Sequence, residues 1–103
     1  MADTRKKAVP ASAAQQIDVT FTTMVVADDN SGWLCVRMEG SAEVFGTGKS
    51  VKVSGTVDGQ EYEASMLPVG GGVHMMPLRA PFRKKIDKGI GDEVTVHLTK
   101  RIF

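Results

Sequence analysis

The sequence predicts a small all-β protein, a closed or partly closed six-stranded barrel with one short helix before the last strand. Three observations lead to this expectation. Apolar or β-branched residues recur at every second position in several segments. Clusters rich in Gly and Asp separate these segments. The chain has 103 residues, which allows one hydrophobic core. A barrel also leaves few strand edges exposed, which suits a protein of this size.

Residues 1–16 are expected to form a disordered tail before a single domain at 17–103. The tail is basic at Arg5–Lys7 and then only weakly apolar, with no aromatic residue. Such a segment has too little surface to bury to offset the entropy of ordering it. It is also too weakly hydrophobic for a signal peptide, and no segment approaches the roughly 18 apolar residues of a membrane helix. We therefore expect a cytoplasmic protein without a membrane segment.

The first two strands are predicted on either side of a turn. Alternation begins at Ile17 and the apolar run continues to Val26, before the turn-forming cluster Asp28–Gly32. The second strand, Trp33–Glu39, starts with four apolar residues in succession, which indicates a central position with both faces covered. We therefore expect Trp33 to belong to the core, and Tyr62 as well.

The next two strands form a predicted hairpin. Ser50–Val57 alternates apolar and polar residues, and Gly55 within it indicates a bend or a close backbone approach. Asp58-Gly59 follows, and this pair favours a two-residue turn with positive φ at both positions. The second strand of the hairpin, Gln60–Leu67, is expected to end at Pro68.

The last third of the chain contains two further strands and the predicted helix. Val73–Leu78 follows three glycines and is expected to be a short strand. Ala80–Asp87 has Pro near its start and places Phe82 and Ile86 four residues apart, which favours a short helix docked through these two side chains. The final strand alternates cleanly from Val94 to Leu98.

The charge is nearly balanced overall but uneven along the chain. Thirteen basic and twelve acidic residues give a net charge of +1. Residues 18–63 carry eight acidic and three basic residues, whereas residues 64–103 carry three acidic and seven basic ones. The basic residues concentrate at positions 79–88, around the predicted helix. Such a surface could hold an anion, but a solvated helix face explains it more simply, because exposed basic faces are common on short helices.

A candidate site for a small anionic ligand follows from this concentration of charge. In it, the glycines permit close approach, while the histidine and the basic side chains donate hydrogen bonds. The triple glycine lacks the spacing of a phosphate-binding loop and precedes a strand where that loop requires a helix. A histidine satisfied by backbone hydrogen bonds is the alternative interpretation of His74. The candidate residues are Gly70, Gly71, Gly72, His74, Arg79, Arg83 and Lys84.

Catalytic and metal-binding functions find little support in the residue pattern. Cys35 lies between Leu34 and Val36, so a buried, unreactive thiol is expected. The two histidines and this cysteine are too few and too scattered to indicate a zinc site. No nucleophile with an adjacent base can be assembled from spacing. The sequence therefore predicts no catalytic residue, no metal and no cofactor.

A series of short motifs in the last two thirds of the chain points to a known family. The motifs are Phe45-Gly46, Val51–Gly59, Leu67-Pro68, Gly70–His74, Met75–Leu78, Arg83-Lys84 and Gly91–Val96. In order and spacing these motifs resemble the bacterial and archaeal family called domain of unknown function 1905, over roughly residues 17–98. The resemblance implies a small β-barrel of the double-split type, shared in outline with AbrB- and MazE-like regulators, and no established activity. Relatives often carry Gly at the position of Asp87.

Three functional hypotheses remain open at this point. The first is a non-enzymatic binding module for a small or anionic ligand. The second is a DNA-binding or antitoxin-like regulator acting as a dimer, suggested by the barrel type and the basic ends of the chain. The domain is, however, not strongly basic, and no exposed aromatic row is expected. The third is a small hydrolase or isomerase. The sequence does not separate a monomer from a homodimer.

Overall fold

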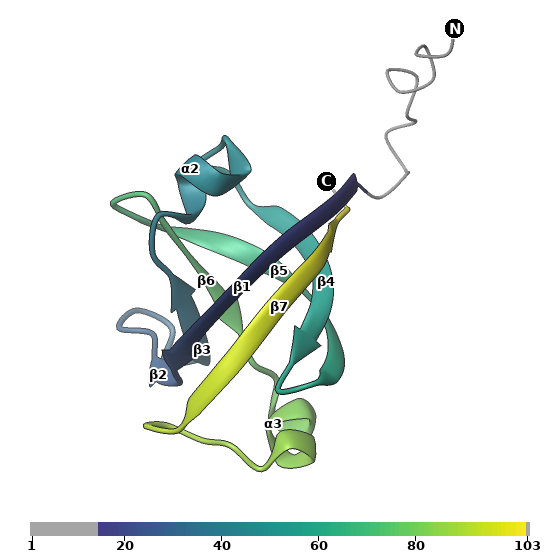
Figure 1. Ribbon diagram of the computed structural model, residues 1–103. Helices are drawn as coiled ribbons and strands as arrows, with labels where there is room; N and C mark the ends of the chain where they lie inside the picture. Colours follow the sequence, from purple (N-terminus) through teal and green to yellow (C-terminus); the bar gives the residue numbers. More distant parts are fainter. Residues whose placement is uncertain (1–14, 103) are drawn as a thin grey trace, which may run out of the picture.

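The computed structural model describes residues 15–102, and Figure 1 shows the arrangement of the strands and helices. Seven strands and two short helices occur within this range. In chain order they are β1 (Gln15–Met24), β2 (Val26–Ala27), β3 (Leu34–Met38), α2 (Ser41–Phe45), β4 (Val51–Val57), β5 (Gln60–Gly70), β6 (Val73–Pro77), α3 (Ala80–Ile86) and β7 (Glu93–Arg101).

The strands form one antiparallel, strongly curled sheet in the order β1-β7-β4-β5-β6-β3-β2. The two outermost strands, β1 and β2, are consecutive in the chain and are separated only by Val25. Val25 is fully buried, and its backbone exchanges hydrogen bonds of 2.9 Å with Gly91 and Asp92. One bent segment therefore pairs with β7 through β1 and with β3 through β2. The chain itself therefore joins the two edge strands of the sheet at this bend. Away from the bend, β1 and β3 form no strand pair with each other.

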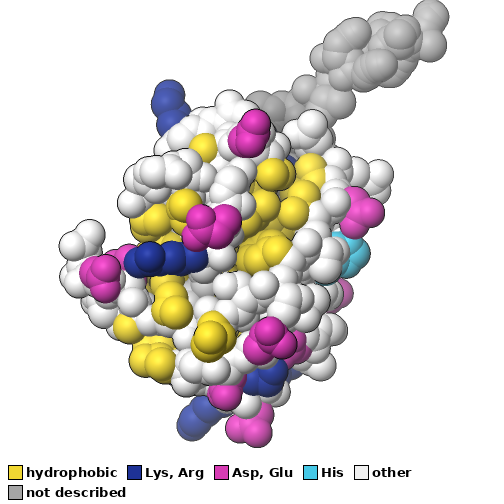
Figure 2. Space-filling view, turned by 60° about the vertical axis from the view of Figure 1, so that its left-hand side comes forward, with side chains coloured by type: hydrophobic (Ala, Val, Ile, Leu, Met, Phe, Trp, Pro, Cys, Tyr) yellow, Lys and Arg dark blue, Asp and Glu magenta, His cyan; other side chains and the backbone are white. Residues whose placement is uncertain are grey.

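The barrel is consequently open between β1 and β3. The inward side chains of β1, which are Ile17, Val19 and Phe21, are only partly buried. Their counterparts on the neighbouring strand β7 are almost completely buried. Figure 2 shows hydrophobic side chains gathered on this side of the molecule.

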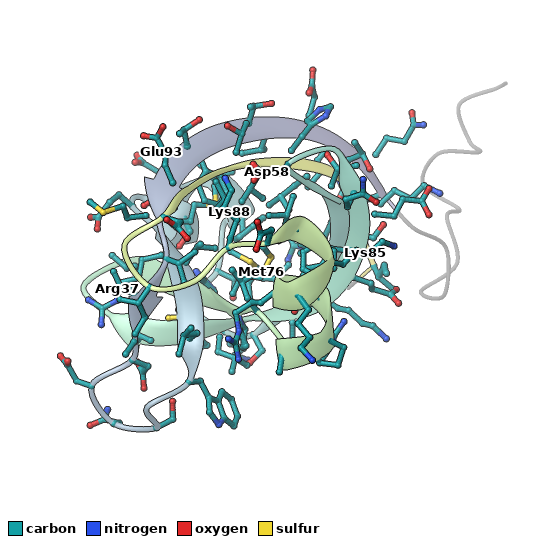
Figure 3. All side chains as sticks on the ribbon, turned by 90° about the horizontal axis from the view of Figure 1, so that it is seen from below. Arg37, Asp58, Met76, Lys85, Lys88 and Glu93 are labelled. Carbon is teal, nitrogen blue, oxygen red and sulfur yellow. The ribbon has the colours of Figure 1, made fainter. Side chains whose placement is uncertain are left out.

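The core lies inside the curl and consists mainly of valine, methionine and leucine. β4 contributes three inward valines, and β5 contributes Tyr62, Ala64 and Met66, so alternate residues of each strand face inward. Helix α3 lies across one end of the barrel, with Phe82 stacked on Tyr62 at 4.1 Å between ring centroids. In Figure 3, seen from that end, Met76 points into the barrel and Lys85 away from it.

The predicted all-β class is confirmed, whereas the predicted closure and strand number are wrong. The sheet is open, and it has seven strands because the first predicted strand divides at Val25 into two strands with different partners. The predicted helix is confirmed as α3. A second helix, α2, was not expected. It has five residues, flanked by Gly40 and Gly46 in the left-handed conformation.

Two local predictions for the central hairpin are confirmed. Asp58 and Gly59 both have positive φ, at 52° and 81°, as the two-residue turn requires. A Cβ atom at Gly55 would lie 2.0 Å from the carbonyl oxygen of His97. Only glycine therefore allows β4 and β7 to approach this closely. β5, by contrast, continues past Pro68 to Gly70.

The predicted tail falls almost entirely on residues 1–14, which lie outside the described part of the chain. Gln15 and Gln16 differ from the expectation, because they belong to β1 and pair with Arg101 and Lys100. No helix within residues 15–102 is long and apolar enough to cross a membrane.

Candidate functional site

The structure divides the seven candidate residues between two ends of the barrel. Gly70, Gly71 and Gly72 form the tip of the β5–β6 hairpin, and His74 follows directly on β6. The three basic residues lie on or next to α3, beyond the other end of β6 (Figure 1). An extended chain advances about 3.3 Å per residue, so the backbones of His74 and Arg79 are roughly 16 Å apart along the strand. The seven residues do not form one surface.

His74 is fully buried and its ring is held by hydrogen bonds on both sides. Nε2 lies 2.8 Å from the carbonyl oxygen of Lys49, which can only accept, so Nε2 carries the proton and donates it. Nδ1 then accepts from the Ser41 hydroxyl at 2.7 Å, and the same oxygen accepts the His74 backbone N–H at 2.6 Å. The ring also packs edge-on against Phe45. These contacts fasten α2 and the segment after it to β6.

The Ser41–His74 pair has the hydrogen bond of a catalytic serine and its base but lacks access to a substrate. Both residues have 0% exposure, so neither side chain can be reached from solvent. Nearby, the Gly72 carbonyl accepts the backbone N–H of Ala42 at 3.1 Å. The hydrogen bonds of His74, Ser41 and Gly72 therefore hold α2 against the β5–β6 hairpin, which is a structural role.

The other end of the barrel contains an open groove of about 590 Å³. It runs between the start of β3, the outer surfaces of β5 and β6, and the first turn of α3. Its lining is mainly apolar, with two arginines at the helix. The lining residues are Gly32, Trp33, Leu34, Ser65, Leu67, Pro77, Leu78, Arg79, Ala80 and Arg83. We call this feature the α3 groove. A groove of this volume suits a small organic ligand.

Arg79 belongs to the α3 groove but is already engaged by protein groups. Its Nη2 donates to the Glu63 carbonyl at 2.9 Å, and its guanidinium carbon lies 4.6 Å from the centroid of the Tyr62 ring. The Tyr62 hydroxyl accepts the backbone N–H of Arg79 and donates to the Pro77 carbonyl. Arg79 therefore places a positive charge at a fixed position on one side of the α3 groove.

Arg83 follows one helical turn later and, unlike Arg79, uses neither of its terminal nitrogens in a hydrogen bond within the described residues. Its Nε donates to the Leu78 carbonyl at 2.9 Å, which holds the guanidinium in place. Within residues 15–102, neither terminal nitrogen of Arg83 makes a hydrogen bond or an ion pair. The side chain is partly exposed. Arg83 can thus offer a two-pronged donor to a carboxylate or phosphate.

Lys84, the seventh candidate, is exposed on α3 and does not line the α3 groove. Acidic residues offset much of the charge around the helix. Lys88 forms an ion pair with Asp58 at 2.8 Å and donates to the Glu93 carbonyl (Figure 3). Partial burial favours a higher pKa for Asp58, but the hydrogen bonds from Lys88 and Thr95 outweigh it and leave the pKa below its usual value. The helix surface is therefore mixed in sign.

Trp33 is the residue that the sequence prediction placed wrongly. It is 54% exposed and lines the α3 groove instead of the core, because it ends the turn before β3 begins at Leu34. Tyr62, the other aromatic residue expected in the core, is buried there. The cluster of turn-forming residues directly before Trp33 was the available signal that its side chain lies at a strand end.

The turn that carries Trp33 is tightly hydrogen-bonded. Asp28 Oδ2 accepts from the Ser31 N–H and hydroxyl, both at 2.9 Å, and from the Asn30 N–H. The bonds from Ser31 lower the pKa of the Asp28 carboxyl. The Trp33 carbonyl accepts the Asp28 N–H at 2.8 Å, and its own N–H donates to the Ser31 hydroxyl. The backbone of Trp33 is thus fixed, while about half of the residue's surface stays exposed.

The remaining reactive groups do not form a second centre. Cys35 is fully buried, as expected, and burial raises the pKa of its thiol. His97 bonds Asp18 at 2.7 Å, but this carboxylate is highly exposed, so the pair lacks the buried environment of a catalytic acid or base. In the described part of the chain, no three His, Cys, Asp or Glu side chains gather in a metal-binding arrangement.

Comparison with known families places this geometry in context. The profile of the family described as Domain of unknown function (DUF1905) matches residues 21–98. The chain belongs to this family. The match covers every described element except the first part of β1 and the end of β7. Comparison with curated proteins gave no match. The family description states no activity, so a functional argument has to start from the α3 groove.

Proposed function

We propose that the protein is a non-enzymatic binding module for a small organic anion, and that the anion occupies the α3 groove. The observation that carries the proposal is the joint presence of an exposed indole, an apolar floor and two arginines around one groove. An apolar floor contributes affinity through burial of ligand surface, and charge-assisted hydrogen bonds select an anionic group. The proposal keeps Arg79 and Arg83 from the sequence-derived site and adds Trp33.

The absence of a usable nucleophile, base or metal set among the described residues favours binding over catalysis. The Ser41–His74 pair is sealed, and the groove lining offers only one hydroxyl, from Ser65. A hydrolase or isomerase needs a proton-transferring group within reach of its substrate. Arginine side chains stay protonated and act as donors in this role.

A dimeric DNA-binding regulator is the less supported alternative. It would rest on the double-split barrel type that the family resemblance implies. The basic side chains of α3 share their surface with acidic ones. Glu61 and Glu63 line a depression together with Arg79 and Lys85, and Lys88 is paired with Asp58. A phosphate backbone favours a continuous basic surface, which this arrangement does not offer.

A thermal-shift screen with small carboxylates, phosphates and sulfonates tests the proposal. Binding to the folded state raises the unfolding temperature, and hits are then titrated against the variant Arg79→Ala/Arg83→Ala. We expect the stabilisation to disappear in this variant. The matched control is Lys84→Ala/Lys85→Ala, which removes the same charge from the same helix outside the α3 groove and should preserve the stabilisation. A screen without hits, or equal loss in both variants, would contradict the proposed function.

A further inference from the structure

We infer that the ligand of the α3 groove is a planar aromatic carboxylate. Its ring would stack on Trp33, and its carboxylate would accept hydrogen bonds from Arg83. This inference rests on the proposed function and names the ligand class. It draws on three features of the groove, which are the uncovered indole, the free donors of Arg83 and the scarcity of other polar groups.

The indole of Trp33 is a preformed surface for an aromatic ring. A large apolar side chain that is 54% exposed leaves surface uncovered that a ligand can bury. The hydrogen bonds of the Asp28–Trp33 turn fix the backbone at both the N–H and the carbonyl of Trp33. A rigid aromatic side chain loses little conformational entropy when a ring stacks on it. This arrangement favours a flat, polarisable partner over a flexible aliphatic chain.

Arg83, rather than Arg79, has both terminal nitrogens of its guanidinium free to bind a carboxylate. Arg79 uses one terminal nitrogen on the Glu63 carbonyl and stacks on Tyr62. The only hydrogen bond of the Arg83 side chain in the described structure involves Nε. Two parallel N–H groups at its end match the two oxygens of a carboxylate. Arg79 contributes positive potential, and Arg83 makes the directed contact.

The rest of the lining favours a single negative charge over a phosphate dianion. Apart from the two arginines, the polar side-chain groups of the α3 groove are the Ser65 hydroxyl and the indole N–H of Trp33. A phosphate dianion presents more acceptor oxygens than the free end of Arg83, one hydroxyl and one indole N–H can satisfy, so part of its charge would keep only water as a partner beside an apolar lining. A carboxylate needs two donors, which Arg83 supplies.

Four probes that share a bicyclic frame test this assignment by calorimetry or NMR titration. We expect naphthoate to bind at least about tenfold more tightly than naphthylmethanol, which lacks the charge. It should also bind about fivefold more tightly than decalin carboxylate, which has the charge but no flat ring. Naphthyl phosphate should bind no more tightly than naphthoate. A clear preference for the phosphate would overturn the carboxylate assignment.

Variants assign the two preferences to their residues. Trp33→Leu should abolish the preference for naphthoate over decalin carboxylate, and Trp33→Phe should restore most of it. Arg83→Gln should abolish the preference for naphthoate over naphthylmethanol, whereas Arg79→Gln should reduce it by about twofold or less, because Arg79 is held by Tyr62 and Glu63. Lys84→Gln is the charge-matched control and should change neither preference.

The outcomes separate the ligand class from the proposed function. Equal binding of naphthoate and decalin carboxylate, both abolished by Arg79→Ala/Arg83→Ala, would overturn the aromatic assignment and leave the anion-binding function intact. Equal effects of Arg83→Gln and Arg79→Gln would overturn the role of Arg83. If none of the charged probes binds and the anion screen is also negative, both the ligand class and the proposed function fail.

Discussion

Both ends of the barrel carry groups that can form hydrogen bonds, but the two ends differ in how many of these groups the fold already uses. At the α2 end, His74, Ser41 and Gly72 have almost all their hydrogen-bonding groups satisfied by one another or by backbone carbonyls. At the α3 end, Trp33 keeps an uncovered ring and Arg83 keeps free donors. A polar residue is available to a ligand only where the fold leaves its surface and its donors unused. By that criterion the α2 end stabilises the fold, and the α3 end is where we propose that a ligand binds.

The largest effect that distinguishes the two ends is expected from the two histidines. His74→Ala removes a fully buried ring and leaves the Ser41 hydroxyl and the Lys49 carbonyl without their partner, so we expect a loss of about 3 kcal/mol in the free energy of unfolding. His97→Ala is the matched control, because His97 is partly exposed and bonds an exposed carboxylate. Its loss should stay below about 1 kcal/mol. Chemical denaturation measures both. Similar losses of unfolding free energy in His74→Ala and His97→Ala would show that the hydrogen bonds of His74 do not stabilise the fold.

A smaller effect is expected from the glycines at the tip of the β5–β6 hairpin. Gly72 has a φ of +78° with open space around it, so Gly72→Ala should cost about 1 kcal/mol through backbone strain alone. Gly48 also has open space but no positive φ, and Gly48→Ala should be neutral or slightly stabilising. Anion binding should remain unchanged in both. Loss of anion binding in Gly72→Ala would return the hairpin to the binding site.

The acid dependence of stability should reveal the ion pair beside α3. The pKa of Asp58 is lowered in the folded state, so its contribution is present above the pKa of the unfolded chain, near 3.9, and is lost as the pH falls through the folded value. Asp58→Asn should therefore be less stable than the wild type at neutral pH, and the difference should shrink below about pH 4. Unfolding midpoints measured across this range provide the test.

A control for the acid dependence is available in the turn before Trp33. Asp29 is exposed and makes no hydrogen bond or ion pair within the described residues. The stability difference between Asp29→Asn and the wild type should therefore not change as the pH is lowered. If the difference between Asp58→Asn and the wild type stayed constant with pH, the ion pair with Lys88 would not contribute to stability.

The smallest effect on stability is expected in the α3 groove itself. Trp33→Leu should change the free energy of unfolding by less than about 1 kcal/mol, because half of the side chain is exposed and its backbone bonds remain. A loss above about 2 kcal/mol in chemical denaturation would show that Trp33 mainly supports the fold. The contrast between the ends would then lose its functional meaning.

The sequence predicted the parts of this fold that rest on local patterns. Alternation located most strands, and Asp58-Gly59 located the hairpin, because side-chain period and turn conformation are local properties. Whether the barrel closes was not predictable in this way, since it depends on the bend at Val25, which divides the first predicted strand into β1 and β2. Helix α2 was missed because five residues between two glycines show no helical period. Asp87 adopts a left-handed conformation at the end of α3, with a φ of +56°, which the pattern of apolar residues did not show.

Which residues line the α3 groove could be predicted only in part, for a related reason. The concentration of basic residues led to Arg79 and Arg83, which do lie in one groove. The glycines and His74 were grouped with them because they are close in sequence, but β6 carries the chain from one end of the barrel to the other. Trp33 was assigned to the core because four successive apolar residues resemble a strand covered on both faces. Its exposure depends on where the turn ends, which the pattern did not show.

The most direct test of anion binding in the α3 groove follows the indole N–H signal of Trp33, the only tryptophan in the chain, during an NMR titration with naphthoate. The account predicts a saturable shift of this signal and no change in the backbone amide of His74 at the opposite end. A shift at His74 or at the Gly70–Gly72 tip, with the Trp33 signal unchanged, would contradict it.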